Sequence, residues 1–194
     1  TSSIDRTPGM EVDRPQCEAS PPGRMPFPLS EESQRRWPAA SWGYLQRVKS
    51  LDHMSCGPLY DSEEGGFFRN AGNADWSDPQ REKLLEDNIS LAQVYLDANS
   101  VLDRDDYRRV ASQTVDYIVT SLFDSEIPGF RGSQGAHSDY FSLPVSSRME
   151  QEVPAVDPYL YTHSNAQSVS LLLDAAWKLS RPELTGTDCA VLDH

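Results

Sequence analysis

Apolar residues recur with helical spacing in four segments of this 194-residue chain, which begin near residues 41, 77, 105 and 162. The second segment carries the strongest pattern. Ser77 or Asp78 can cap it, Pro79 fits its first turn, and its apolar positions form one face. A short polar turn joins it to the third segment. We therefore expect residues 77–122 to form an antiparallel pair of amphipathic helices.

The stretch between the third and fourth segments is long and lacks helical periodicity. It reads GSQGAHSDYFSLPVSSRMEQEVPAVDPYLY, which is long for a connection inside a compact domain. Only YFSLPV, at residues 140–145, has the composition of a short strand. We expect a loop with, at most, one short strand.

A Gly-Phe pair occurs twice, at Gly66-Phe67 and at Gly129-Phe130. The two phenylalanines are 63 positions apart, an interval that contains one helical hairpin and its loop. A repeat of this length is typical of a stacked or circular array of hairpins. Glycine permits a tight return after the loop, and we expect each phenylalanine to fill the end of a hairpin. The fold class is therefore all-α.

The N-terminal stretch has a different composition. Residues 1–38 hold seven of the fourteen prolines, which exclude a helix or a central strand. The same stretch contains Met25, Phe27 and Trp37, which would be costly to leave in water. We divide the chain into an extended Pro-rich arm at 1–40, which docks on a partner or on its own domain, and a helical domain at 41–194.

Charge and motifs exclude several classes of function. The formal charge of −13 is unevenly spread, because residues 1–50 carry seven basic and six acidic side chains and residues 51–194 carry ten and twenty-four. Such an acidic body disfavours nucleic acid as a partner. No apolar run is long enough to span a bilayer. No nucleotide-binding, hydrolase or metalloprotease motif occurs, and we expect no cofactor and no metal site. The sequence does not indicate a compartment.

A series of residues from Gly65 to Ala166 resembles the toroidal region of the thioredoxin-domain-containing proteins related to spermatogenesis-associated protein. That region is similar to N-acylglucosamine epimerases and six-hairpin glycosidases. The resemblance implies a partial (α/α) toroid. It spans roughly residues 45–180 and rests on Gly65-Gly66-Phe67, Arg69, Asp75-Trp76, Pro79, Glu82-Lys83-Leu84-Leu85, Asp87-Asn88, Gly129-Phe130, Ser133-Gln134, Tyr140, Asp157 and Asn165-Ala166.

The chain departs from the family pattern at polar positions. The family has Pro-His before its Glu-Lys pair, whereas Gln80 follows Pro79 here. It also has Ser-Gln-Asp-Ala-Asp, whereas Ser133-Gln134 precedes Gly-Ala-His here. The preceding thioredoxin domain and the second half of the toroid lie outside this sequence. These departures favour a degenerate relative that has lost catalysis.

The resemblance places candidate site residues at the mouth of the toroid, where sugars bind in the similar enzymes. Glycoside chemistry needs two carboxylates across a substrate, and Glu82, Asp139 and Asp157 are the candidates. The simpler interpretation is that Glu82 and Lys83 form helix-start hydrogen bonds or ion pairs, that Asp87 and Asn88 bind loop backbone, and that Asp75 is a cap. The candidate binding residues are Asp75, Trp76, Lys83, Asn88, Gln134 and Asn165.

Two functions follow from these observations. The first is a non-catalytic structural or accessory subunit of a larger assembly, whose protein partners contact the N-terminal arm and the open edge of the toroid. An arc of hairpins that does not close should expose apolar stripes on its terminal helices. The alternative is a carbohydrate-active enzyme or sugar-binding domain.

Overall fold

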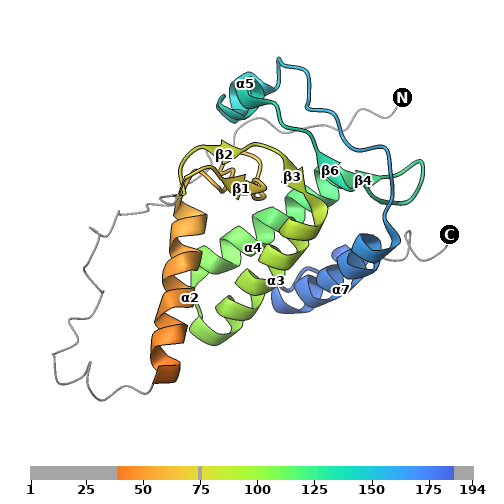
Figure 1. The fold of residues 1–194 in the computed structure, drawn as a ribbon. Coiled ribbons are helices and arrows are strands. Elements are labelled where there is room, and N and C mark those ends of the chain that lie inside the picture. Colours follow the sequence, from red (N-terminus) through yellow and green to blue (C-terminus); the bar gives the residue numbers. More distant parts are fainter. Residues whose placement is uncertain (1–38, 74–75, 186–194) are drawn as a thin grey trace.

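The fold is mostly helical, as expected, and consists of helical hairpins whose loops gather at one end (Figure 1). The computed structural model describes residues 39–73 and 76–185. Four long helices span these residues: α2 (Ala39–Cys56), α3 (Leu85–Leu102), α4 (Asp105–Tyr117) and α7 (Thr162–Lys178). The expected docking of the Pro-rich arm at 1–38, and any further helix after residue 185, lie outside the described residues.

Helices α3 and α4 form the expected antiparallel hairpin, and α7 lies beside α3 (Figure 1). Three pairs of side chains join α3 to α7 in ascending order along both helices, so the two helices run in the same direction. These pairs are Glu86 with Ser164, Gln93 with Asp174, and Asp97 with Lys178. Parallel α3 and α7, with antiparallel α4 packed on α3, repeat the arrangement of one hairpin beside the next.

Short strands and two short helices occupy the loop end. Strand β1 (Asn70–Ala71) pairs with β2 (Pro79–Gln80), β3 (Lys83–Leu84) with β6 (Ser133–Gln134), and β4 (Phe123–Asp124) with β5 (Gly129–Phe130), all antiparallel. Helices α5 (Ser138–Phe141) and α6 (Val145–Arg148) lie between β6 and α7. The loops of both hairpins therefore meet in one layer above the helices.

The second helix begins later than the sequence pattern predicts. Residues 79–80 and 83–84 are extended, and α3 begins only at Leu85. The expected capping by Ser77 or Asp78 is therefore wrong. The reason is tertiary, because the backbone of 79–84 pairs with β1 and with β6, which is contributed by residues some fifty positions later. Those ladder hydrogen bonds outweigh a helix propensity that is worth only a fraction of a kcal/mol per residue, about 0.7 or less.

Two further elements differ from the expectation. The YFSLPV stretch forms no strand, because its ends belong to α5 and α6 and the His137 side chain accepts a hydrogen bond from the Tyr140 N–H at the start of α5. The third helix ends as a π-helical turn, η1 (Ile118–Leu122), instead of continuing as α-helix. Such turns occur often at functional sites.

The core lies between α3, α4, α7 and the loop layer. Phe67 and Phe130, the two corner phenylalanines, are both fully buried, which confirms that they fill the hairpin ends. The Phe67 ring packs against the rings of Tyr60 and Tyr95, with centroids 4.9 and 5.5 Å away. The Phe130 ring packs against Phe123, with centroids 5.2 Å apart.

Candidate functional site at the loop end

The first Gly-Phe corner is held by Asn88, in the first turn of α3. The Asn88 carboxamide oxygen accepts a hydrogen bond from the Phe67 N–H at 2.6 Å. Its amide nitrogen donates to the Phe67 carbonyl at 3.1 Å and to the Leu84 carbonyl, one helical turn earlier, at 2.8 Å. The side chain is fully buried. Asn88 therefore binds loop backbone, as the simpler interpretation of the sequence predicted.

The second corner uses the same device. The Asn165 oxygen accepts from the Phe130 N–H at 2.7 Å, and its amide nitrogen donates to the Phe130 carbonyl at 2.9 Å. It also donates to the carbonyl of Tyr161, one turn earlier, at 3.0 Å. The two asparagines, 77 positions apart, therefore make the same set of hydrogen bonds to the backbone of the two phenylalanines. The internal repeat seen in the sequence is thus also a repeat of three-dimensional structure.

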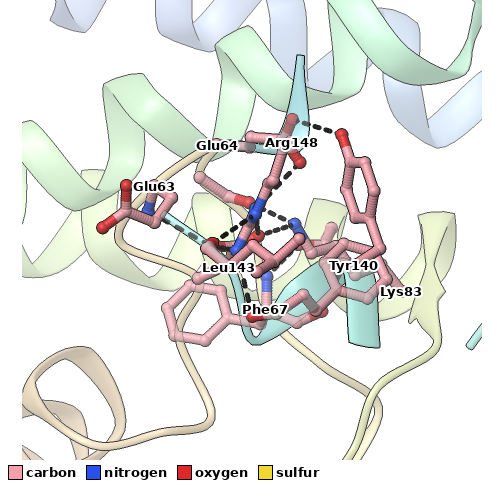
Figure 2. A network of polar contacts seen from close by, with 11 residues as sticks. Glu63, Glu64, Phe67, Lys83, Tyr140, Leu143 and Arg148 are labelled. Carbon is pink, nitrogen blue, oxygen red and sulfur yellow. Dashed lines mark hydrogen bonds and ion pairs between the residues drawn. The ribbon is translucent and has the colours of Figure 1, made fainter. Parts of the chain in front are cut away.

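A buried ion network lies beside the first corner (Figure 2). The Lys83 ammonium donates to Asp61 Oδ2 at 2.8 Å and to the Gly65 carbonyl at 2.7 Å. The Arg148 guanidinium, from α6, donates to both Asp61 oxygens at 2.8 and 3.1 Å. All three side chains are almost completely inaccessible to solvent. One carboxylate therefore binds two buried cations.

Glu64 and Tyr140 complete this network toward solvent (Figure 2). Glu64 accepts from Arg148 at 2.9 Å and from the Tyr140 hydroxyl at 2.7 Å. Arg148 also donates to the carbonyls of Leu143 and Phe141, at 2.9 and 3.1 Å. The long connection between β6 and α7 is thereby fastened to the first corner, so it is an ordered cover and not an open loop.

The charges in this network shift the pKa values of its members. Burial by itself raises the pKa of the Asp61 carboxyl, but Lys83 and Arg148 hold that pKa below its ordinary value. Burial raises the pKa of Tyr140 to about 12, and its hydrogen bond to Glu64 acts in the same direction. Asp61 is therefore ionised at neutral pH and Tyr140 remains a donor.

Two buried polar atoms next to Lys83 have no hydrogen-bond partner among the described residues: the Tyr117 hydroxyl and the Gln134 carboxamide oxygen. Lys83 Nζ lies 4.3 Å from the centroid of the Tyr117 ring. Gln134 is opposite Lys83 in the β3–β6 ladder, and opposite residues of a ladder share one face. Burial raises the pKa of Tyr117. The interior beside Lys83 thus has one unused acceptor and one unused hydroxyl.

The other candidate residues lie around this layer. Asp75 is outside the described residues. Trp76 is half-buried against the core with a left-handed backbone, at φ 66°. Glu82 accepts from Arg69 at 2.9 Å, and an ion pair was one of the two contacts that the simpler interpretation allowed. Lys83, Asn88, Gln134 and Asn165 are brought to the same end of the molecule. The Lys83 side chain binds a carboxylate, and those of Asn88 and Asn165 bind backbone.

The candidate carboxylates contact different segments. Asp139 is exposed in α5. Asp157 accepts from the Tyr161 hydroxyl and from the Tyr159 N–H, both at 3.0 Å. Glu82 is held by Arg69 at the edge of β3. Their catalytic role therefore stays a prediction, with no partner shared between any two of the three in the described part of the chain.

Sequence reasoning missed Asp61, Glu64 and Arg148. Nothing in the local pattern marks them, because Arg148 lies 87 positions after Asp61 in a stretch without periodicity. One signal was available through Lys83. Successive side chains of a strand point to opposite faces, so in a strand at this position the Lys83 side chain would point into the core. A buried lysine requires a carboxylate partner. The expectation of a helix over 77–102 concealed that signal.

The described residues contain no cluster of three or more histidine, cysteine or acidic side chains able to hold a metal ion. Among the helices that the structure describes, none is long and apolar enough to cross a membrane.

Comparison with known proteins supports the fold. No protein-family model matches the sequence, and no curated protein matches it significantly. Among solved structures, the chain is similar to a glycoside hydrolase family 76 mannosidase from Bacteroides thetaiotaomicron, with a TM-score of 0.60 and 14% identity over 80% of this chain. It is also similar to cellobiose 2-epimerase from Spirochaeta thermophila, with a TM-score of 0.53 and 17% identity over 80% of this chain.

The chain spans 38% of the mannosidase and 37% of the epimerase. Identities this low support the fold alone. The narrower resemblance, to the thioredoxin-domain-containing proteins, is not shown by these comparisons. The described residues therefore have the fold of part of an (α/α) toroid, in agreement with the partial toroid expected from the sequence.

Proposed function

We propose that this chain is a non-catalytic structural component of a larger protein assembly, built on part of an (α/α) toroid scaffold. One observation carries the proposal. Three of the candidate binding residues are engaged in holding the fold: Asn88 and Asn165 bind backbone, and Lys83 pairs with Asp61. A side chain whose hydrogen bonds are used within the fold has few free donors or acceptors to offer a substrate.

Exposed apolar residues on α3 and α7 support the same proposal, since an arc of hairpins without neighbours leaves such residues in water. The test is the mass of the native particle, measured by size-exclusion chromatography with light scattering on extracts of the producing cells. We expect a particle larger than one chain. A native mass equal to one chain would contradict the proposal.

A second candidate is carbohydrate binding at the loop end. The two similar structures are, by their names, a mannosidase and a cellobiose epimerase. Here Tyr159 and Tyr161, two and four positions after Asp157, are exposed, and the Tyr161 hydroxyl donates to Asp157. Aromatic rings beside a carboxylate suit a sugar.

The second candidate is tested by a saccharide panel read by thermal shift. A sugar that raises the melting temperature of the native chain, but not of Glu82→Gln or Asp157→Asn, would favour it. No shift with any saccharide would exclude it and leave the structural proposal in place.

A further inference from the structure

The connection between β6 and α7 makes a closed excursion from the body of the fold. Its two ends are joined, because the Gly135 N–H donates to the Ala155 carbonyl at 2.8 Å and the Asp157 N–H donates to the Ser133 carbonyl at 2.9 Å. The nineteen residues between Gly135 and Ala155 therefore leave the body and return to it at one point. We call residues 136–154 the cover loop. Long loops whose ends lie close together are often functional elements.

The cover loop is fastened to the segment just before the first corner (Figure 2). Its Arg148 binds Asp61 and Glu64, and the Tyr140 hydroxyl donates to Glu64 at 2.7 Å. The first backbone N–H of α6 donates to a Glu63 carboxylate oxygen at 2.8 Å. These contacts between loop and body are polar, and three of the four are made by the side chains of Arg148 and Tyr140.

Little of the cover loop is buried. Four of its nineteen residues are buried, and one of these, Arg148, is charged. The other three are Tyr140, Phe141 and Pro154. Three of its apolar side chains are exposed: Val145, Met149 and Val153. A segment with few buried apolar contacts opens at a low free-energy cost while the rest of a protein stays folded. The cover loop therefore has the properties of a segment that opens independently.

Lys83 lies beneath the cover loop. Its Nζ is 5.0 Å from the centroid of the Phe141 ring, which belongs to the cover loop, and 4.3 Å from the centroid of the Tyr117 ring, which belongs to α4. The ammonium group thus contacts both the loop and the helical body, and its side chain has no exposed surface. Removal of the loop would take away one wall of this site and admit water to Lys83.

The charges of the body stay balanced when the cover loop leaves. Asp61 binds two cations, of which Lys83 belongs to the body and Arg148 to the cover loop. Withdrawal of Arg148 leaves one carboxylate paired with one ammonium group, so no charge remains buried without a partner. The Glu64 side chain, the second partner of Arg148, is 28% exposed and can be hydrated. Opening therefore does not require the body to unfold.

We propose that the cover loop is a hinged flap, which turns on its joined ends, is held closed by Arg148 and exposes Lys83 when it opens. This inference goes beyond the proposed structural function and does not depend on it. Opening also hydrates the Tyr117 hydroxyl and the Gln134 carboxamide oxygen, which have no hydrogen-bond partner among the described residues, and this lowers its cost. The open form presents a lysine–carboxylate pair that the closed surface hides.

The experiment measures how fast Lys83 is acetylated in the folded full chain by the N-hydroxysuccinimide ester of acetic acid. The chain has three lysines, so the exposed Lys49 and the half-buried Lys178 are references in the same peptide map. We expect Lys83 to react at least about 100-fold more slowly than Lys49, because reaction requires opening. Urea should raise the Lys83 rate only slightly, because a local opening exposes little surface. A rate that rises with the full urea dependence of unfolding would overturn the proposal.

Arg148→Met removes the contact that holds the flap closed and keeps an apolar side chain in its place. We expect acetylation of Lys83 to accelerate by at least about tenfold, with the Lys49 rate and the helical circular dichroism unchanged. Arg131→Met is the matched control, because Arg131 also pairs with a carboxylate, that of Asp124, but lies outside the cover loop. It should leave the Lys83 rate unchanged. Equal Lys83 rates in the native chain and in Arg148→Met would overturn the role of Arg148.

Hydrogen exchange of the native chain gives a second measurement that needs no variant. We expect the amides of α5 and α6 to exchange together and faster than those of α3 and α4. Exchange of the cover loop at the rate of α3 would show that it opens only when the whole chain unfolds, and would overturn the proposal. Neither readout depends on the mass of the native particle. A native mass of one chain would therefore contradict the structural function and leave the flap in place.

Discussion

The two Gly-Phe corners make the same hydrogen bonds in different surroundings. At the first corner Asn88 is fully buried, and the Asp61–Lys83–Arg148 network closes over it. At the second corner Asn165 is half-buried, and the nearest ion pair, Arg131 with Asp124, is partly exposed. The same asparagine-to-backbone hydrogen bonds should therefore contribute differently to stability at the two corners, because their burial differs.

Backbone strain separates the corners as well. Gly66 has a φ of +80°, and a Cβ there would lie 2.7 Å from the Tyr117 ring. Gly129 has no positive φ, and its Cβ would lie 3.1 Å from the flexible end of Leu160. The first corner requires glycine for conformation and for space, whereas the second requires it mainly for space.

The largest expected difference between the corners comes from their ion pairs. Asp61→Asn leaves two cations buried without their carboxylate, and we expect a loss of about 3 to 5 kcal/mol in the free energy of unfolding. Asp124→Asn is the matched change at the second corner and should cost much less, because water screens that pair. Urea unfolding of both variants measures the difference. Equal losses of unfolding free energy in the two variants would show that burial of the Asp61 network adds nothing to stability.

The asparagine clamps should differ next. Asn88→Ala leaves the N–H and C=O of Phe67 buried without partners, at a cost of about 2 to 4 kcal/mol in unfolding free energy. Asn165→Ala should cost about 1 kcal/mol, because water can reach that corner. Thermal and urea unfolding provide the comparison. If the Asn165 variant proved the less stable of the two, burial would not be the deciding factor.

Glycine replacement gives a smaller expected effect. Gly66→Ala forces a side chain into a left-handed backbone against Tyr117, and we expect a loss of about 1 to 3 kcal/mol. Gly129→Ala has no unfavourable φ but brings a Cβ to 3.1 Å from the end of Leu160 and 3.2 Å from the Asn165 oxygen, and it should cost about 1 kcal/mol. The midpoints of denaturant unfolding test both values. A larger loss of stability in Gly129→Ala than in Gly66→Ala would show that the second corner, and not the first, has the stricter requirement for glycine.

The pH dependence of stability should report on the buried network at the first corner. The pKa of Asp61 is depressed in the folded chain, so its contribution to stability is complete above the ordinary value of 3.8 and is lost as pH falls through the lower folded value. Urea midpoints should therefore drop on acidification below about pH 4. Asp61→Asn should flatten this drop. An identical slope in both proteins would mean that other carboxylates control acid unfolding.

Local patterns were enough to predict the helices and the repeat. The helical segments and the antiparallel α3–α4 hairpin follow from apolar spacing, and the paired Gly-Phe corners indicated one unit of an array. The simpler interpretation of the sequence also had Asn88 as a ligand of loop backbone, since asparagine side chains commonly bind backbone. The helices depend on residues within one or two turns of each other, whereas Asn88 binds Phe67, 21 positions earlier in the chain.

The start of α3, the fate of residues 138–148 and the ion network were not predictable in this way. Residues 79–84 are extended because β6 arrives from 50 positions later, and Lys83 is buried because Asp61 and Arg148 converge on it. Periodicity reports which face of a segment is apolar, but not which distant segment covers it. The sequence by itself therefore determined the helices and their hairpin repeat, whereas only the tertiary structure decided the burial and the pairing of charges, because those depend on contacts between distant parts of the chain.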